Sequence, residues 1–228
     1  MRIDAVRAQA VAVGACAAIA IGAAQGWLPV EIGWAFKPLT TLLILAYAWR
    51  RAGLTAVQAR CVRLGLSLSL VGDVALLWPG AGFLAGLIAF LLAHLAYVAA
   101  FCVPLRLAAR KGPFVAYAAV AAVILVPLWP HLPVALHAPV LAYVLCLATM
   151  AAQAAAWWQS RIGADDATHA RSAALGGLLF MASDSLLAIN RFALPLPLAS
   201  LWILLTYWLA QWRIASSLRG AAVPPTSP

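Results

Sequence analysis

The chain alternates long apolar runs with short connections that contain proline or glycine. Each run holds about 17–25 mostly apolar residues, which as a helix is long enough to cross the hydrocarbon of a bilayer. With 66% hydrophobic and 9% charged residues, the chain is far more apolar than a soluble domain, so the bilayer must be its solvent. The runs lack the strict alternation of barrel strands, which leaves helices. Eight runs can be drawn, over residues 5–24, 32–49, 62–78, 82–103, 113–130, 134–158, 172–190 and 195–215.

This pattern predicts an all-α membrane protein, a bundle of eight transmembrane helices that forms a single transmembrane domain over residues 1–220. We expect the short, proline-rich remainder, 221–228, to be a disordered tail. Thirteen of the fifteen Lys and Arg residues fall on one face of the bundle, and only Lys37 and Arg191 fall on the other. The positive-inside rule makes the crowded face cytoplasmic, with both termini inside. The protein would then be a multi-pass integral protein, of the cytoplasmic membrane if its source is bacterial.

Two features of the charge distribution admit other interpretations. A net charge of +9 would suggest nucleic acid in a soluble protein. Here the basic residues lie in short loops without a basic aromatic stripe, so they indicate orientation beside anionic lipid, and no nucleic-acid partner is expected. At the N-terminus, Arg2, Arg7 and the apolar run up to Ala23–Ala24 also resemble a signal peptide, whose removal would leave seven helices. Protein partners cannot be inferred.

Two carboxylates lie inside apolar runs: Asp73 in LSLSLVGDVALLW and Asp184 in ALGGLLFMASDSLLAI. A charged side chain at membrane depth costs roughly 2.5–3.5 kcal/mol on insertion scales, and such residues mark functional sites by default. In the predicted orientation Asp73, Asp184 and Lys37 all lie roughly 7–12 Å below the outer boundary, at about 1.5 Å per residue. This shared depth predicts one polar pocket in the outer half of the bundle. No metal or organic cofactor is indicated.

Each of these charged residues also has a purely structural interpretation. Asp73 could bond Ser69 one turn below or pair with Lys37, and Lys37 could snorkel to the interface instead of holding a phosphate. The candidate partners of Asp184 lie close to it in the sequence: Ser183, Ser185 and Asn190.

The run over 82–103 carries aromatic and polar side chains at spacings of three and four, hence on one helix face. Because this stripe includes a His and a Tyr that both need partners, a pocket wall is favoured over plain packing. Its members are Phe83, Gly86, Phe90, His94, Tyr97 and Phe101. In the last run Tyr207 and Gln211 also share a face, and they either line the pocket or bond between helices.

Common catalytic signatures are absent from the sequence. There is no GxSxG elbow, HExxH or P-loop, and four scattered cysteines predict neither a zinc site nor a disulfide framework. The segment LVGD resembles half of the GxGD signature of intramembrane aspartyl proteases, but Leu70 stands in place of the first glycine. Aligning Asp73 with Asp184 also aligns Gly65 with Gly176, which reflects either a duplicated four-helix unit or common apolar composition.

Taken together, these residues resemble the YhhN/TMEM86 family of integral membrane proteins, the lysoplasmalogenases. The matching elements, in chain order, are Lys37–Pro38, SLSLVGDVALL around Asp73, FLAGLIAFLLAHLAYVAAF, GGLLFMASDSLLAINRF around Asp184, and TYWLAQ with Tyr207 and Gln211. The resemblance implies eight helices and hydrolysis of the vinyl ether bond of lysoplasmalogens. The products would be a fatty aldehyde and glycerophospho-ethanolamine or -choline.

Two acids in one pocket suit this reaction. A vinyl ether is protonated at its β-carbon, water adds to the resulting oxocarbenium ion, and the hemiacetal collapses. This requires a proton donor and a carboxylate, which two carboxyls in different environments supply. We expect Asp73 and Asp184 to be this general acid and base, in an order that the sequence leaves open. The residues expected to bind the lysophospholipid are Lys37, His94, Tyr97, Tyr207, Gln211, Phe83, Phe90, Ser183 and Asn190.

Two rival functions use the same features. A proton-coupled transporter of a small or lipidic solute also places acids at depth, but it favours helices broken at mid-span, whereas the prolines here sit mostly at run ends. A lipid-binding or scaffold protein without catalysis would have its two aspartates pointing apart or fully paired with Lys37.

Overall fold

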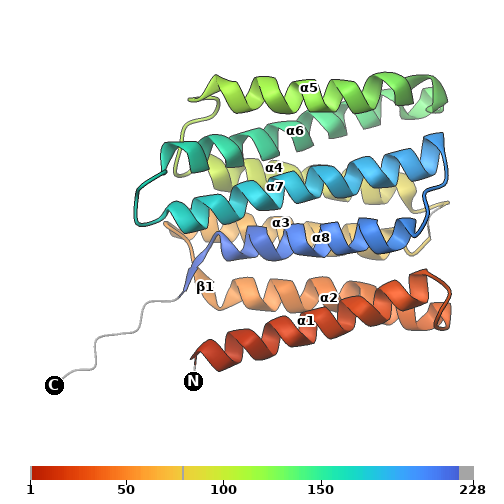
Figure 1. The fold of residues 1–228 in the computed structure, drawn as a ribbon, viewed down its shortest axis with the longest axis horizontal. Coiled ribbons are helices and arrows are strands. Elements are labelled where there is room, and N and C mark those ends of the chain that lie inside the picture. Colours follow the sequence, from red (N-terminus) through yellow and green to blue (C-terminus); the bar gives the residue numbers. More distant parts are fainter. Residues whose placement is uncertain (1, 79, 221–228) are drawn as a thin grey trace.

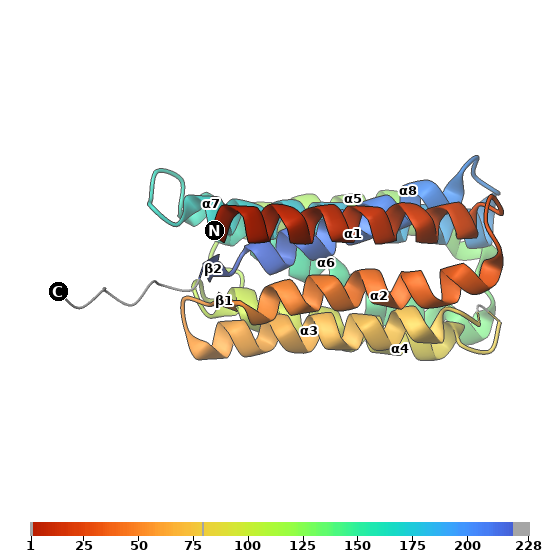
Figure 2. The same cartoon turned by 90° about the horizontal axis from the view of Figure 1, so that it is seen from below.

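The computed structural model describes residues 2–78 and 80–220 of the chain. Within them, eight α-helices run side by side along the long axis of the molecule (Figures 1 and 2). This confirms the prediction of an all-α membrane protein. The helices are α1 (Arg2–Ala24), α2 (Val30–Trp49), α3 (Ala56–Ala75), α4 (Phe83–Cys102), α5 (Lys111–Leu128), α6 (His137–Ser160), α7 (Ala167–Ala188) and α8 (Ala199–Ser216). Short 3-10 turns, Trp129–His131 and Val134–Leu136, join α5 to α6, and a π-helical turn, Ile189–Ala193, extends α7.

Six of the helices form a closed ring. Going round it, α2 packs on α3, α3 on α4, α4 on α6, α6 on α7 and α7 on α8, and α8 returns to α2. The other two helices lie outside the ring: α1 packs against α2 and α8, and α5 packs against α6. The interior of the ring holds the buried polar side chains on which the candidate site is built.

The outer faces of the bundle are apolar. On α5, for example, Val115, Val123 and Val126 are 69–75% exposed, which suits contact with lipid. Among the described residues, six helices have the length and hydropathy to cross a membrane: α1, α2, α4, α5, α6 and α7. The remaining two helices carry polar residues: α3 contains Arg60, Arg63 and Asp73, and α8 contains Gln211 and Arg213. The chain is therefore a multi-pass membrane protein, while eight crossings and cytoplasmic termini stay predictions.

Several helices differ in extent from the apolar runs. Helix α3 begins at Ala56, before the expected residue 62, because the Thr55 hydroxyl caps it by accepting a hydrogen bond from the Gln58 N–H at 3.2 Å. Helix α7 likewise begins at Ala167 rather than 172, so basic residues next to an apolar run continue its helix. Helix α8 begins at Ala199 rather than 195, because two prolines precede it and Leu198 adopts a left-handed conformation with φ 54°.

The α2–α3 connection and the segment after α8 meet at one end of the bundle (Figure 1). Strand β1 (Arg51–Ala52), between α2 and α3, pairs antiparallel with β2 (Arg219–Gly220), which follows α8. The Arg51 Nε also donates to the Leu218 carbonyl at 2.8 Å. These contacts tie the last helix to the α2–α3 connection. The expected disordered tail, 221–228, lies outside the described residues.

Two glycines at corresponding positions allow close approach between helices. A Cβ on Gly65 of α3 would lie 2.2 Å from Tyr97 Cε1 of α4, and one on Gly176 of α7 would lie 2.7 Å from Ile214 Cγ1 of α8. Small residues at helix interfaces are typical of membrane bundles. The helix pairs α3–α4 and α7–α8 thus each pack closely at a glycine. Duplication of a four-helix unit stays a hypothesis.

Candidate active site

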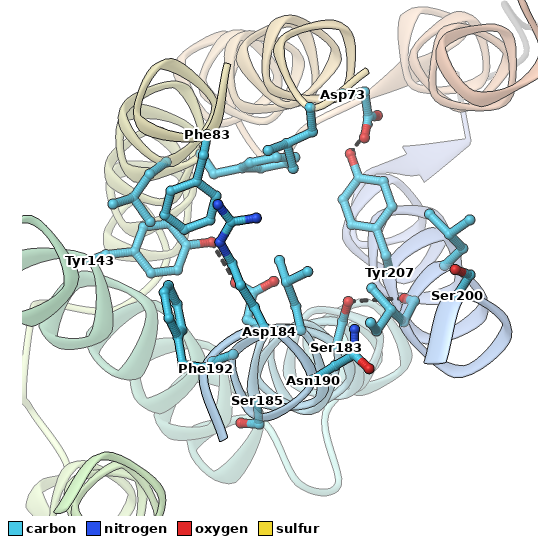
Figure 3. Close-up of a pocket in the computed structure, with 18 of the residues that line it drawn as sticks. Asp73, Phe83, Tyr143, Ser183, Asp184, Ser185, Asn190, Phe192, Ser200 and Tyr207 are labelled. Atoms are coloured by element: carbon cyan, nitrogen blue, oxygen red, sulfur yellow. Dashed lines mark hydrogen bonds between the residues drawn. The ribbon is translucent and has the colours of Figure 1, made fainter. Parts of the chain in front are cut away.

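A cavity of about 480 Å³ lies between the ring helices and extends to α1 and α5, and both intramembrane aspartates line it. Asp73 comes from α3 and Asp184 from α7; they lie on opposite sides of the cavity, each beside a tyrosine (Figure 3). The other expected site residues that line it are Lys37, Phe83, Phe90, Ser183, Asn190 and Tyr207. Three expected residues, His94, Tyr97 and Gln211, are fully buried and are not part of its wall.

Asp73 is held by hydroxyl groups from two other helices. Its Oδ2 accepts hydrogen bonds from Thr41 Oγ1 at 2.6 Å and from Tyr207 OH at 2.8 Å. The Trp208 indole N–H in turn donates to Thr41 Oγ1 at 3.1 Å. Lys37, one turn before Thr41 on α2, acts on Asp73 electrostatically, but the described residues show no ion pair between them within 4.0 Å. The two partners considered from the sequence were a hydrogen bond to Ser69 and an ion pair with Lys37. Neither forms with the Asp73 carboxyl among the described residues.

The Tyr207 hydroxyl is also held by a series of hydrogen bonds between buried side chains. Gln211 Nε2 donates to Tyr207 OH at 3.2 Å, and Tyr97 OH donates to Gln211 Oε1 at 2.7 Å. Ser69 Oγ lies 3.5 Å from Tyr97 OH. Tyr97 and Gln211 therefore act on the cavity only through Tyr207. Because every member of this series is buried and partnered, the series fixes the Tyr207 hydroxyl toward Asp73.

Asp184 has a simpler environment. Its Oδ2 accepts a hydrogen bond from the hydroxyl of Tyr143, on α6. The ring of His94 packs edge-on against Tyr143 and Phe180, with centroids 5.2 and 4.5 Å apart. The His94 ring nitrogens have no hydrogen-bond partner among the described residues. His94 thus supports the back of Tyr143 rather than the cavity surface.

The polar neighbours of Asp184 in the sequence bond elsewhere. Ser183 Oγ donates to the Ile203 carbonyl at 3.0 Å, and Ser185 Oγ donates to the Met181 carbonyl at 2.7 Å. Asn190 Oδ1 accepts from the Leu196 N–H at 2.9 Å and so closes the turn before α8. All three line the cavity, but none satisfies the Asp184 carboxyl.

The cavity wall has a charged part and an apolar part. Lys37 and Arg191 are the cations that line it among the described residues. Arg191 places its guanidinium over the Phe83 ring, 3.9 Å from the centroid, and Phe83 meets Phe192 edge-on at 5.9 Å. Apolar side chains come from several helices, and those of α5 and α6 are Ala121, Ile124, Leu125, Leu128, Val140, Val144 and Leu147. Such a cavity suits an amphiphile with one hydrocarbon chain and an anionic group.

Sequence reasoning missed two hydroxyls that hold the carboxyls, Thr41 and Tyr143. Thr41 follows the Lys37–Pro38 segment by one turn, which places it on the Lys37 face of α2. That spacing is the signal that could have found it. Tyr143 lies in an apolar run, HAPVLAYVLCL, and nothing in its spacing distinguishes it from a packing residue.

Fold and site together define a multi-pass, all-α membrane protein with two carboxyls in an amphipathic cavity. Comparison with known proteins places it more closely: the model of the YhhN family matches residues 32–218. The chain belongs to the YhhN family.

Several curated proteins are similar to the chain. Human lysoplasmalogenase TMEM86B is 33% identical over 211 residues, which cover 88% of this chain and 83% of that protein. Human lysoplasmalogenase TMEM86A is 35% identical over 161 residues, covering 70% and 65%. The lysoplasmalogenase of Mycobacterium tuberculosis is 34% identical over 142 residues, covering 57% and 49%. No solved structure matches the chain.

Proposed function

We propose that this protein is a membrane-embedded ether hydrolase, which cleaves the vinyl ether bond of lysoplasmalogens to a fatty aldehyde and glycerophospho-ethanolamine or -choline. One observation carries the proposal: Asp73 and Asp184, 111 positions apart in the chain, line one cavity between the helices. The membership of the family and the names of its similar members, lysoplasmalogenases, supply the substrate class.

The wall of the cavity supports a lysophospholipid as the substrate. The apolar side of α5 and α6 can accept the single alkenyl chain, and Lys37 and Arg191 can attract the phosphate. The vinyl ether lies between chain and headgroup in such a lipid, and would therefore come between the two carboxyls. In a bacterium we expect the protein in the cytoplasmic membrane, with substrate entering from the outer half of the bilayer.

The two rival functions fit these observations less well. A transporter with a broken helix at its site is not favoured, because α2 continues through Pro38 as one helix from Val30 to Trp49. A scaffold without catalysis would keep its acids apart or paired, whereas both line the cavity and Asp73 bonds two hydroxyls.

The test is an assay of the purified protein in detergent or proteoliposomes. Lysoplasmalogen and its saturated 1-alkyl ether analogue are supplied separately, and fatty aldehyde is measured. We expect aldehyde from the vinyl ether alone, because a saturated ether has no C=C double bond whose β-carbon could accept a proton. Absence of aldehyde from both, with uptake of solute into proteoliposomes driven by a proton gradient, would replace this proposal with the transporter.

A further inference from the structure

The cavity gives the two carboxyls different surroundings, and the difference bears on which one supplies the proton. Asp73 accepts hydrogen bonds from two hydroxyls, those of Thr41 and Tyr207, and the Lys37 ammonium acts on it. Hydrogen bonds donated to a carboxylate and a nearby cation both favour its ionised form. Asp73 is thus surrounded by groups that stabilise a negative charge.

Asp184 lacks comparable support. Among the described residues it accepts one hydrogen bond, from Tyr143, whose far side is packed against the His94 ring. Lys37 acts electrostatically on Asp73, and Arg191 places its guanidinium over the Phe83 ring. A carboxyl in an apolar cavity with a single neutral donor holds its proton more readily than one with several donors and a cation.

We propose that Asp184 is the general acid that protonates the vinyl ether and that Asp73 is the carboxylate that activates water. The assignment rests on the proposed function and deepens it. It follows from the placement of Lys37, Thr41 and Tyr207 at Asp73 and of the Tyr143 hydroxyl at Asp184. The chain Tyr97–Gln211–Tyr207 then serves to position Asp73.

With these roles, each carboxyl returns to its starting protonation state at the end of one turnover. Asp184 transfers its proton to the β-carbon, the π electrons of the C=C bond form the new C–H bond, and the α-carbon becomes an oxocarbenium centre. Water forms a bond to that α-carbon while Asp73 accepts a proton from it, giving the hemiacetal. The hemiacetal O–H returns its proton to Asp184 as the C=O bond of the aldehyde forms. The bond from the α-carbon to the glycerol oxygen breaks, and that oxygen takes the proton from Asp73. Both carboxyls then have their starting protonation states.

The groups around each carboxyl make the assignment testable by pH dependence. Around Asp73 these are Lys37 on α2 and Tyr207 on α8, with Tyr97 on α4 behind. Around Asp184 they are Tyr143 on α6, with His94 on α4 and Cys146 on α6 behind it, and Arg191 on the π-helical turn across the wall. A base must be ionised, so it sets the acidic limb of the kcat/KM profile, and an acid must be protonated, so it sets the basic limb.

The experiment compares pH profiles of kcat/KM for lysoplasmalogen between the purified wild type, Lys37→Gln and Tyr143→Phe. Lys37→Gln removes a cation that favours ionised Asp73, so the acidic limb should move to higher pH by about one unit while the basic limb stays. Tyr143→Phe removes the donor to Asp184, so the basic limb should move to higher pH and the acidic limb should stay. Tyr117→Phe, on α5 and outside the cavity wall, is the matched control and should move neither limb.

The opposite pattern, with Lys37→Gln moving the basic limb and Tyr143→Phe the acidic one, would reverse the assignment. Unmoved limbs in both variants would overturn it as well. If Lys37→Gln fails to give a monodisperse protein, Thr41→Val removes another stabilising partner of ionised Asp73 and should move the same limb. The wild type distinguishes failure of the assignment from failure of the proposed function. A wild type that releases no aldehyde overturns the proposed function itself, whereas an active wild type leaves only the roles of the two aspartates in question.

Discussion

At the scale of single residues, the site depends on side chains that oppose the cost of burying a carboxyl in a membrane. Asp73 is 1% exposed, yet its Oδ2 has donors from α2 and α8. Because an acid inside a membrane is costly, Asp73 and Asp184 could be identified as candidate functional residues from the sequence. Thr41 and Tyr143 were not visible, because a hydroxyl on a helix can satisfy itself locally and its role depends on the neighbouring helix.

Replacing Tyr207 by Phe removes one of the two hydroxyls that donate to Asp73 while keeping the ring. A hydrogen bond to a charged group contributes about 1.5–3 kcal/mol, so kcat should fall by about ten- to a hundredfold. Steady-state aldehyde release measures the change. The Tyr117→Phe variant should keep the wild-type kcat, and a Tyr207→Phe enzyme with unchanged kcat would show that this hydroxyl does not support the reaction.

At the scale of helices, the positions of the site residues follow from which faces meet inside the ring. Spacings of three and four correctly placed Phe83 and Phe90 of α4 at the cavity wall. The same stripe continues to His94 and Tyr97, which lie behind the wall, because a stripe of several turns extends beyond the depth of one cavity. Periodicity therefore predicted the inward face of α4, but how far the cavity extends along that face depends on the helices opposite.

The contact between α3 and α4 is the part of the fold most sensitive to a small increase in volume. A Cβ on Gly65 would meet the Tyr97 ring at 2.2–2.7 Å, so Gly65→Ala must displace the ring that bonds Gln211. Overpacking of this kind typically costs about 1–3 kcal/mol. We expect a lower midpoint of thermal unfolding in detergent together with lower activity. Gly14→Ala on α1, with nothing within 4 Å of the added Cβ, is the control. Equal midpoints for both variants would contradict the packing described here.

At the scale of the whole molecule, the sequence predicted the bundle because apolar runs and basic connections are the two strongest signals in a membrane chain. Helix ends were less predictable, since the runs exclude charged residues such as Arg60 and Arg171 that the helices include. The ring of six helices with α1 and α5 outside could not be predicted from one sequence, because nothing local specifies which apolar faces meet.

The predicted orientation can be tested by cysteine labelling of intact cells. On a background without native cysteines, Ala109→Cys reports on the α4–α5 connection and Leu194→Cys on the turn before α8. A membrane-impermeant maleimide should label Leu194→Cys in intact cells and Ala109→Cys only after the cells are permeabilised. The reverse pattern would place the arginine-rich end outside.

An ionic contact outside the spanning helices joins the α6–α7 connection to the segment after α8. Asp166 accepts from Arg161 Nε and Nη2 at 3.1 and 2.8 Å and lies 3.6 Å from an Arg219 nitrogen. Hydrogen bonds from Arg161 are the main cause that lowers the pKa of Asp166, so its stabilising effect is present above about pH 3.9 and is lost as pH falls through the lowered pKa.

Asp166→Asn should therefore lower the unfolding midpoint at pH 7, and the difference from the wild type should disappear in strong acid. Thermal scans of both proteins in detergent across pH measure this. The exposed neighbour Asp165→Asn is the control and should match the wild type throughout. A difference that persists at the lowest pH would show that the effect of Asp166→Asn does not arise from its charge.

The central claim is that Asp73 and Asp184 act together in one cavity, and aldehyde release from lysoplasmalogen by Asp73→Asn and Asp184→Asn tests it most directly. General acid or base catalysis contributes about 10²–10⁴-fold, so each variant should lose at least about a hundredfold in kcat while eluting as a folded protein. Asp165→Asn, the same change at an exposed site, should retain full activity. Wild-type rates of aldehyde release from both pocket variants would contradict the account.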